Sequence, residues 1–140
     1  MFVVLAFVDV QPERVVEFEA LAAQLWSASH ALEPGLRRYE YARREAPGSY
    51  LVAMTFDDYE AFITHQASDH HVELAGAMRD MFVRLEIEYA DPVTGAFGVP
   101  EPDTADAGDW ELSVPRARRP DYERRYPRPD APWWRRDVGA

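Results

Sequence analysis

This chain lacks cysteine and lysine and has no long apolar run. These absences exclude several kinds of protein and of functional site. Without cysteine it forms no disulfide, no zinc–thiolate or iron–sulfur site, and no thiol nucleophile. All fifteen basic residues are arginine, which we attribute to the coding bias of a GC-rich genome rather than to function. The apolar start, Phe2 to Val8, is too short to span a bilayer and has no basic segment before it. We therefore expect neither a membrane anchor nor a signal peptide.

Basic residues are outnumbered by acidic ones, fifteen to twenty-five, so the formal net charge is −10 over 140 residues. Nucleic-acid binding needs a concentrated basic surface, so we expect no nucleic-acid partner. The length and the 47% apolar content suit one ordinary globular domain, and we expect a cytoplasmic protein. The charge is uneven, since residues 1–90 carry seven arginines against fifteen acids, whereas residues 112–140 carry eight against four.

An apolar strand and a long amphipathic helix are expected first. Phe2 to Val8 is unbroken and apolar, as in a strand covered on both faces. Pro12 suits the first turn of a helix, and apolar residues then recur at three- and four-residue intervals up to Leu32. The sequence Glu33-Pro34-Gly35 ends that helix.

The next fifty-five residues contain the patterns of three strands and two short helices. Apolar alternation indicates the strands, and polar capping residues indicate the helix starts. The order is therefore βαββαβ, which predicts an α+β fold of the ferredoxin-like type. The predicted elements are strands at Leu36–Arg43 and Ser49–Phe56 joined by a turn at residues 45–48, a helix opened by Asp57 and Glu60 as a capping box, a second helix capped at Ser68-Asp69, and a strand from Val83 to Tyr89.

The last fifty residues have a different composition. They hold eight of the eleven prolines, so we expect little regular structure there. They also carry aromatic residues such as Trp133 and Trp134, which make them too aromatic for a solvated linker. We predict a domain at residues 1–93 and a Pro-, Arg- and aromatic-rich C-terminal arm at residues 94–140 that packs on the body or on a partner subunit.

Residues 61–71, AFITHQASDHH, hold three of the four histidines. They match the pattern Ala-Phe-x-x-His-x-x-Ser-x-His, and with the Pro12 helix and Glu33-Pro34-Gly35 the chain resembles the antibiotic biosynthesis monooxygenase (ABM) family over about residues 2–93. The resemblance implies a homodimer in which two sheets pack into a dimeric α/β barrel, with an apolar cavity between each sheet and its helices. It also implies oxygenases that use no flavin, metal or haem and act on anthrones, hydroquinones and related aromatic polyketides.

The chain departs from the family pattern at the end of the third strand. Members commonly have an acid, a spacer and tryptophan there, where this chain has Met54, Thr55 and Phe56. The first strand also lacks the asparagine that some members use. These departures put anthrone oxidation in doubt and argue against haem degradation. A non-oxidative polyketide cyclase or isomerase, and a non-catalytic small-ligand-binding protein, therefore stay open.

Oxygen reacts readily with closed-shell organic molecules only after a carbanion or phenolate has formed. A cofactor-independent monooxygenase for a phenolic, anthrone or quinol-type substrate therefore needs a base beside a dry pocket. Histidine suits that role, and we predict His65 and His70 as catalytic residues; the alternative for each is a helix-end residue satisfied by local hydrogen bonds. The predicted substrate-binding residues are Phe7, Trp26, Tyr39, Tyr41, Met54, Phe56, Phe62, His71, Met78 and Phe82.

No cofactor and no metal site are predicted. The spacing of His65 and His70 does not stack two ligands on one helix face, and no acid falls at a standard partner position. His71 shares a stripe with Leu74 and Met78, so packing is its simpler role. The expected partners are an aromatic small molecule, dioxygen and a second copy of the chain.

Overall fold

The computed structural model of this protein describes residues 1–100, 108 and 115–131. It divides into two units, Met1–Gly95 and Ala96–Ala140. The predicted functional residues all belong to the first unit, which is described first.

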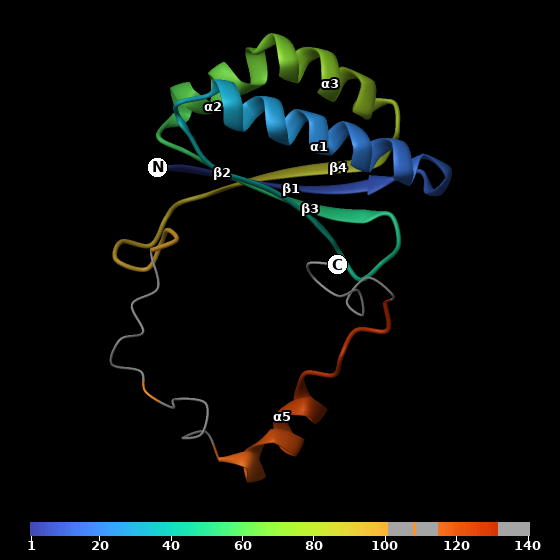
Figure 1. Ribbon diagram of the computed structural model, residues 1–140, viewed down its shortest axis with the longest axis vertical. Helices are drawn as coiled ribbons and strands as arrows, with labels where there is room; N and C mark the ends of the chain where they lie inside the picture. The colour runs from blue at the N-terminus through green and yellow to red at the C-terminus, as the bar shows by residue number, and fades with distance from the viewer. Residues whose placement is uncertain (101–107, 109–114, 132–140) are drawn as a thin grey trace. The chain divides into compact units, whose positions relative to one another are not determined.

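The first unit is a four-stranded antiparallel sheet with helices on one face (Figure 1). The strand order is β2-β3-β1-β4, which is the ferredoxin-like arrangement, so the predicted fold class is confirmed. The elements are β1 Phe2–Val10, the 3-10 turn η1 Pro12–Arg14, α1 Val15–Leu32, β2 Leu36–Arg43, β3 Ser49–Phe56, α2 Tyr59–Ala67, α3 Asp69–Arg79 and β4 Phe82–Ala90.

The core lies between the helices and the sheet. Alternation along β1 turns Val4, Ala6 and Val8 toward the helices, and all three are buried. The long helix α1 places Phe18 and Leu25 on the same side as the sheet, each with about one per cent of its surface exposed. The apolar residues that recur every 3.6 positions in α1 therefore pack against those that recur every two positions in β1, and together they form one apolar layer.

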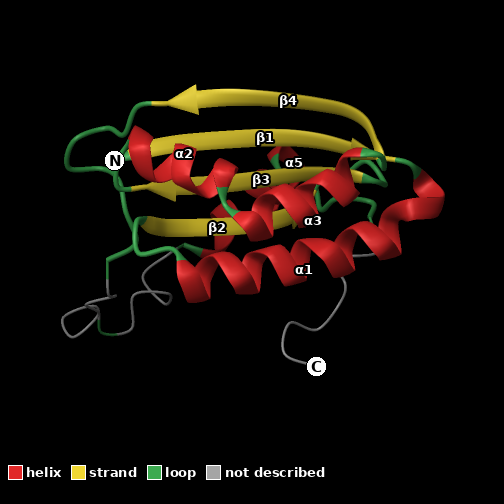
Figure 2. Ribbon diagram, turned by 90° about the horizontal axis from the view of Figure 1, so that it is seen from above, coloured by secondary structure: helices red, strands yellow, loops and turns green. Residues whose placement is uncertain are grey.

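The edge strand β4 is only partly covered. Figure 2 looks onto the helices and shows α1 beside β2 and the shorter helices over the middle of the sheet, with β4 beyond them. Leu85 and Ile87 face the helix side, because they pair with Val8 and Ala6, yet each remains almost half exposed. The strand predicted at Val83–Tyr89 is confirmed, but its burial does not alternate as a half-buried strand would, since every residue of the strand after Phe82 is exposed.

The caps of the two short helices differ from the prediction in one case. The N-cap of α2 is Asp58, whose carboxylate accepts a hydrogen bond from the backbone N–H of Ala61 at 2.8 Å. Asp57, the predicted cap, instead forms an ion pair with Arg37. The prediction for α3 is confirmed, since the Ser68 hydroxyl accepts from the backbone N–H of His71. The two neighbouring aspartates could not be distinguished by sequence pattern.

The second unit contains a 3-10 turn, η2 Arg116–Arg118, followed by the short helix α5 Arg119–Arg125. The expectation of little regular structure is therefore wrong for these ten residues. Pro120 stands in the first turn, where proline is tolerated, and Arg119 pairs with Glu123 one turn later. Trp133 and Trp134 lie outside the described residues, so the packing of the arm and the homodimer stay predictions. In the described parts of both units, no helix is long and apolar enough to cross a membrane.

Candidate functional site

One carboxylate joins the ends of three helices. Glu33 is the C-cap of α1, His65 stands in the last turn of α2, and His70 stands in the first turn of α3. Nδ1 of His65 lies 2.9 Å from both oxygens of Glu33, and Nε2 of His70 lies 2.6 Å from Oε2 of the same carboxylate. The side chain of His65 is fully buried and that of Glu33 nearly so. The structure thus places both predicted catalytic histidines around one acid.

The break at Ser68 makes this arrangement possible. Its backbone is extended, which ends α2 and starts α3 at once. The Ser68 hydroxyl donates to the carbonyl of His65 at 2.7 Å and lies 3.1 Å from Nε2 of His70. Two histidines that would lie on different faces of one continuous helix are therefore turned toward the same point.

Hydrogen bonding to Glu33 assigns the tautomer of His65. Burial by itself raises the pKa of Glu33, but hydrogen bonds from His70 and His65 outweigh it and hold that pKa below its usual value. An ionised carboxylate only accepts hydrogen bonds, so Nδ1 of His65 carries a proton. Burial lowers the pKa of His65 despite the opposing effect of Glu33, which keeps the ring neutral. Nε2 then holds an unshared electron pair.

Nε2 of His65 is buried and has no hydrogen-bond partner among the described residues. The ring is surrounded by Tyr39, Phe56 and His71, whose ring centroids lie 5.3, 5.2 and 4.6 Å away. Buried polar atoms are nearly always paired, so this atom is an exception that needs an explanation. A basic nitrogen held in an apolar setting is the arrangement expected of a general base.

A cavity of about 130 Å³ lies between the sheet and the helices. The rings of Tyr39 and His71, which both contact His65, line it, so one ring separates His65 from the cavity. Burial lowers the pKa of His71 to about 4, so this histidine is neutral near pH 7. Six of the predicted substrate-binding residues line the cavity, namely Tyr39, Tyr41, Met54, His71, Met78 and Phe82.

The other four predicted substrate-binding residues lie elsewhere. Phe7 faces the opposite side of the sheet, where the guanidinium of Arg44 lies 5.4 Å from the centre of its ring. Phe56 and Phe62 pack against each other behind His65 and are buried in the core. Trp26 is 45% exposed and lines a separate groove beside α1. All four were predicted from their apolar character, but that character does not show whether a side chain points into the cavity or away from it.

The hydroxyls of Tyr39 and Tyr41 face each other in this cavity at 2.5 Å, and their rings stack. Both residues point to the helix side of the sheet, as their spacing of two predicts. Burial raises the pKa of Tyr41 to about 12 and also raises the pKa of Tyr39. Both hydroxyls therefore keep their protons at neutral pH, and because one proton is shared between the two oxygens, one O–H of the pair is left to donate to a ligand.

Glu33, His65 and His70 are also the described residues that have the donor set of a metal site, since one ligand atom from each lies within 4.8 Å of the others. Two histidines and a carboxylate suit several divalent ions. His65 would then bind through Nδ1 and leave a buried Nε2–H without an acceptor, whereas metal-bound histidines nearly always donate that proton. The residues therefore fit direct hydrogen bonding to Glu33 better than they fit a metal.

Glu33 is the member of this cluster that the sequence pattern did not indicate. It was assigned only to the end of a helix, and its histidine partners are more than thirty positions away. One signal was present, because an acid at a helix C-terminus is disfavoured by the helix dipole. An acid at such a position suggests a role other than capping.

The sequence pattern of the antibiotic biosynthesis monooxygenase family matches residues 1–76. Similar solved structures include a proposed antibiotic biosynthesis monooxygenase from Caulobacter crescentus, with 30% identity, a TM-score of 0.64, and 66% of this chain and 89% of that chain covered. A second proposed monooxygenase, from Bacteroides thetaiotaomicron, has 26% identity, a TM-score of 0.65 and coverage of 71% and 95%. A conserved protein from Methanosarcina mazei has 25% identity, a TM-score of 0.60 and coverage of 64% and 89%. No curated protein matches the chain significantly.

Proposed function

We propose that this chain, which belongs to the antibiotic biosynthesis monooxygenase family, is a monooxygenase that oxidises a phenolic, anthrone or quinol-type substrate without a cofactor. The observation that carries the proposal is the state of His65. Its Nδ1 is bound to Glu33, and its buried Nε2 has no hydrogen-bond partner in the part of the chain that the structure describes. A base so prepared removes the proton that keeps a phenol or an activated CH₂ inert toward oxygen.

The roles of the site residues follow from their positions. We assign Nε2 of His65 to take the substrate proton, for which the ring of Tyr39 or His71 between it and the cavity has to move aside. Glu33 holds the ring of His65 and stabilises the imidazolium that forms. The O–H of the Tyr39–Tyr41 pair that is not used between the two hydroxyls donates a hydrogen bond to the oxygen on which negative charge develops. His70, which shares the Glu33 carboxylate, is a positioning residue in this scheme. The apolar wall of the cavity excludes water from the anion.

The overall reaction balances without an external reductant. The carbanion of an activated CH₂ group adds oxygen to give a carbon-bound hydroperoxide. Loss of water from that hydroperoxide leaves a carbonyl group, so one oxygen atom enters the product and the other becomes water. The proton taken by His65 is returned to the departing oxygen. The substrate supplies all four electrons.

Oxygen uptake tests this proposal. The assay uses hydroquinones and anthrones with protein shown to be free of metal and flavin, before and after addition of iron(II) or zinc. We expect uptake without added metal, and replacing His65 by alanine should lower the rate by about 10²- to 10⁴-fold with the fold retained. His71→Phe is the matched variant, because His71 contacts His65 and lines the cavity. A larger loss in His71→Phe than in His65→Ala would assign the base to His71.

A non-oxidative cyclase or isomerase is the second candidate. The same base and hydroxyl pair suffice to form and hold an enolate, and no oxygen is then consumed. The end of β3 favours this alternative, because Met54 and Phe56 point into the core where many family members have an acid and tryptophan. Turnover that continues unchanged without oxygen would select this second function.

A further inference from the structure

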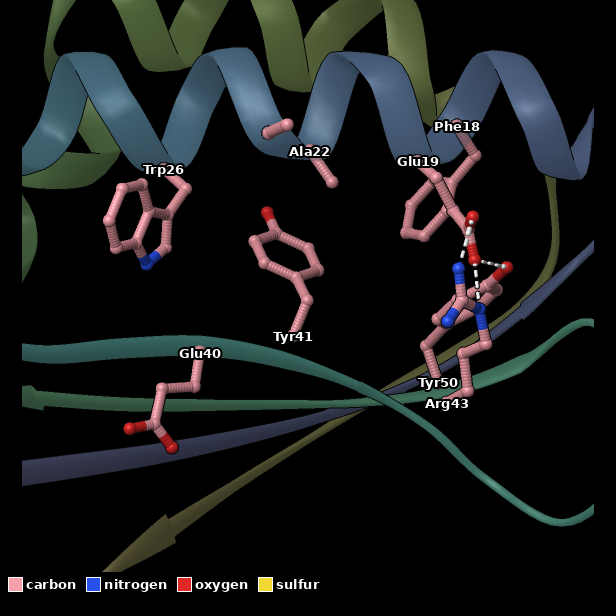
Figure 3. A pocket seen from close by; sticks show the side chains of 9 residues that line it. Phe18, Glu19, Ala22, Trp26, Glu40, Tyr41, Arg43 and Tyr50 are labelled. Carbon is pink, nitrogen blue, oxygen red and sulfur yellow. Dashed lines mark hydrogen bonds and ion pairs between the residues drawn. The ribbon is translucent and has the colours of Figure 1, made fainter. Parts of the chain in front are cut away.

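Two hollows in the first unit meet at the ring of Tyr41. The inner cavity of about 130 Å³ lies between the sheet and the helices, and a groove of about 560 Å³ lies between α1 and the edge strand β2. Phe18 and Tyr41 line both of them. Figure 3 shows the ring of Tyr41 standing on β2 and pointing toward α1. These two rings therefore form the partition between the inner cavity and the groove.

The two hollows differ in the size of molecule that they hold. A dry cavity of about 150 Å³ accepts a single benzene ring, so the inner cavity has room for about one ring. The groove falls within the range of roughly 300–1,000 Å³ that is usual for small-molecule sites. A fused two- or three-ring molecule therefore fits the groove, but it enters the inner cavity only in part.

The walls of the groove suit a flat, uncharged ring. Trp26 is 45% exposed as a residue, with its indole packed on one side by His30, and Ala22 and Ala23 of α1 leave space opposite β2. At one end, Arg43 donates to both oxygens of Glu19 at 2.5 and 2.7 Å (Figure 3). This ion pair neutralises the charge at that end, so an aromatic ring is favoured over an anion.

We propose that a multi-ring aromatic substrate lies across Tyr41, with its reacting ring in the inner cavity and its remaining rings in the groove against Trp26. The placement of the reacting ring rests on the proposed function, whereas ring binding in the groove does not depend on catalysis. Tyr41 has to turn aside for this. Its hydroxyl is bonded to that of Tyr39, whose ring contacts His65, so filling the groove is communicated to the base through two side chains.

Binding of two probes, anthrone with three rings and phenol with one, tests the groove. The readout is the indole N–H signal of Trp26 in nuclear magnetic resonance, assigned with the Trp26→Phe variant. We expect anthrone to shift this signal and phenol to leave it in place. Ala23→Phe fills the groove and should weaken anthrone binding about tenfold or more, as expected for a collision with a packed side chain. Gln24→Phe is the control, since Gln24 is exposed on α1 outside the groove.

The Tyr41→Ala variant tests whether Tyr41 is the partition between the groove and the inner cavity or only supports the fold. Removing the ring should tighten anthrone binding and weaken phenol binding, whereas a general loss of stability would weaken both. Equal effects of Ala23→Phe on the two probes, or an unmoved Trp26 signal with anthrone, would overturn the proposal. Anthrone bound at Trp26 without oxygen uptake would support the groove and refute the oxygenase. Oxygen uptake with hydroquinones and no response of Trp26 to anthrone would do the reverse.

Discussion

Both carboxylate oxygens of Glu33 lie 2.9 Å from Nδ1 of His65, although the two residues are thirty-two positions apart in the sequence. The pair assigns the proton to Nδ1 and leaves Nε2 as the basic atom. The carboxylate also opposes the effect of burial on the His65 pKa, which is nevertheless lowered. Both the orientation and the basicity of His65 therefore depend on one side chain from another helix.

Glu33→Gln should lower the rate by at least about 10²-fold, because a neutral amide stabilises the imidazolium poorly and accepts through only one atom. The acid limb of the rate profile should also move further below the ordinary histidine pKa of 6.5, since the effect that raises the His65 pKa is lost. The ¹⁵N chemical shifts of His65 and the pH dependence of kcat/KM measure both effects. Glu60→Gln, at an exposed position in α2, is the control. An unchanged profile in Glu33→Gln would show that the pair is not used.

Ser68→Ala and Asp58→Ala should each cost about 1 kcal/mol of stability, because each removes the N-cap of a short helix. Thermal unfolding measures this loss. Their activities should differ, since Ser68 also bonds the carbonyl of His65 and lies beside His70, whereas Asp58 accepts from the backbone N–H of Ala61 at the start of α2. We expect reduced turnover only in Ser68→Ala. Equal activity in the two variants would remove Ser68 from the site.

Gly35→Ala should destabilise the protein by about 1–3 kcal/mol, because a methyl group at this position would lie 2.7 Å from Cβ of Ala61. Relief of the clash would displace the turn that connects Glu33 to β2. The position of Glu33 relative to His65 should then change, and turnover should fall too. Adding Ala61→Gly should restore part of the stability, and a double-mutant cycle by chemical denaturation measures the coupling. Gly76→Ala is the opposite case, since a methyl group added there would meet no described atom within 4 Å outside the backbone of its own helix, and it should stabilise by about 0.5–1 kcal/mol. Additive effects of the first two changes would contradict the clash.

Stability should fall as the pH falls from about 6.5 toward 4. The folded pKa of His71 is about 4 against an ordinary 6.5, so the unfolded chain binds this proton first and unfolding becomes easier. The lowered pKa of His65 acts in the same direction. His71→Phe should flatten the fall by about 1–2 kcal/mol, a value reduced for solvent screening. Melting temperatures between pH 7 and 4 measure it, with the exposed His30→Gln as control. A parallel fall in His71→Phe would exclude His71 as its cause.

Removing residues 112–140 should lower the melting temperature and shift the monomer–dimer equilibrium. The prediction follows from composition, because residues 112–140 are aromatic and carry a net charge of +4, with eight arginines against four acids, whereas residues 1–90 carry −8, with seven against fifteen. Light scattering and thermal unfolding of the truncated chain measure the two effects. A truncated chain with unchanged mass in solution and unchanged melting temperature would show that the arm contributes to neither.

The fold was predicted well because apolar periodicity, turn residues and helix caps each depend on residues that are close together in the sequence. The bounds of β2 and β3, Leu36–Arg43 and Ser49–Phe56, agree with the prediction, since proline and glycine mark the turn between them. The cap at Ser68 was found in the same way. Burial along β4 was overestimated, because strand alternation does not reveal which strand the helices leave uncovered.

The site was predicted only in part because its contacts join distant segments. The motif in residues 61–71 identified His65 and His70, but not the acid that they share. The spacing argument treated the two histidines as members of one helix, and the extended backbone at Ser68 makes that treatment wrong. Trp26 was expected beside the substrate, and it lines a groove that no periodicity indicates.

The break at Ser68 also determines where insertions and deletions are tolerated. Each residue added to a helix turns everything after it by about 100°, so one extra residue between His65 and His70 would carry His70 away from Glu33. The turn at residues 45–48 has no such constraint, because it joins two antiparallel strands at the far end of β2 from Glu33. Length variation among descendants of this sequence is therefore expected in that turn, while the four residues between His65 and His70 keep their number even where their identities change.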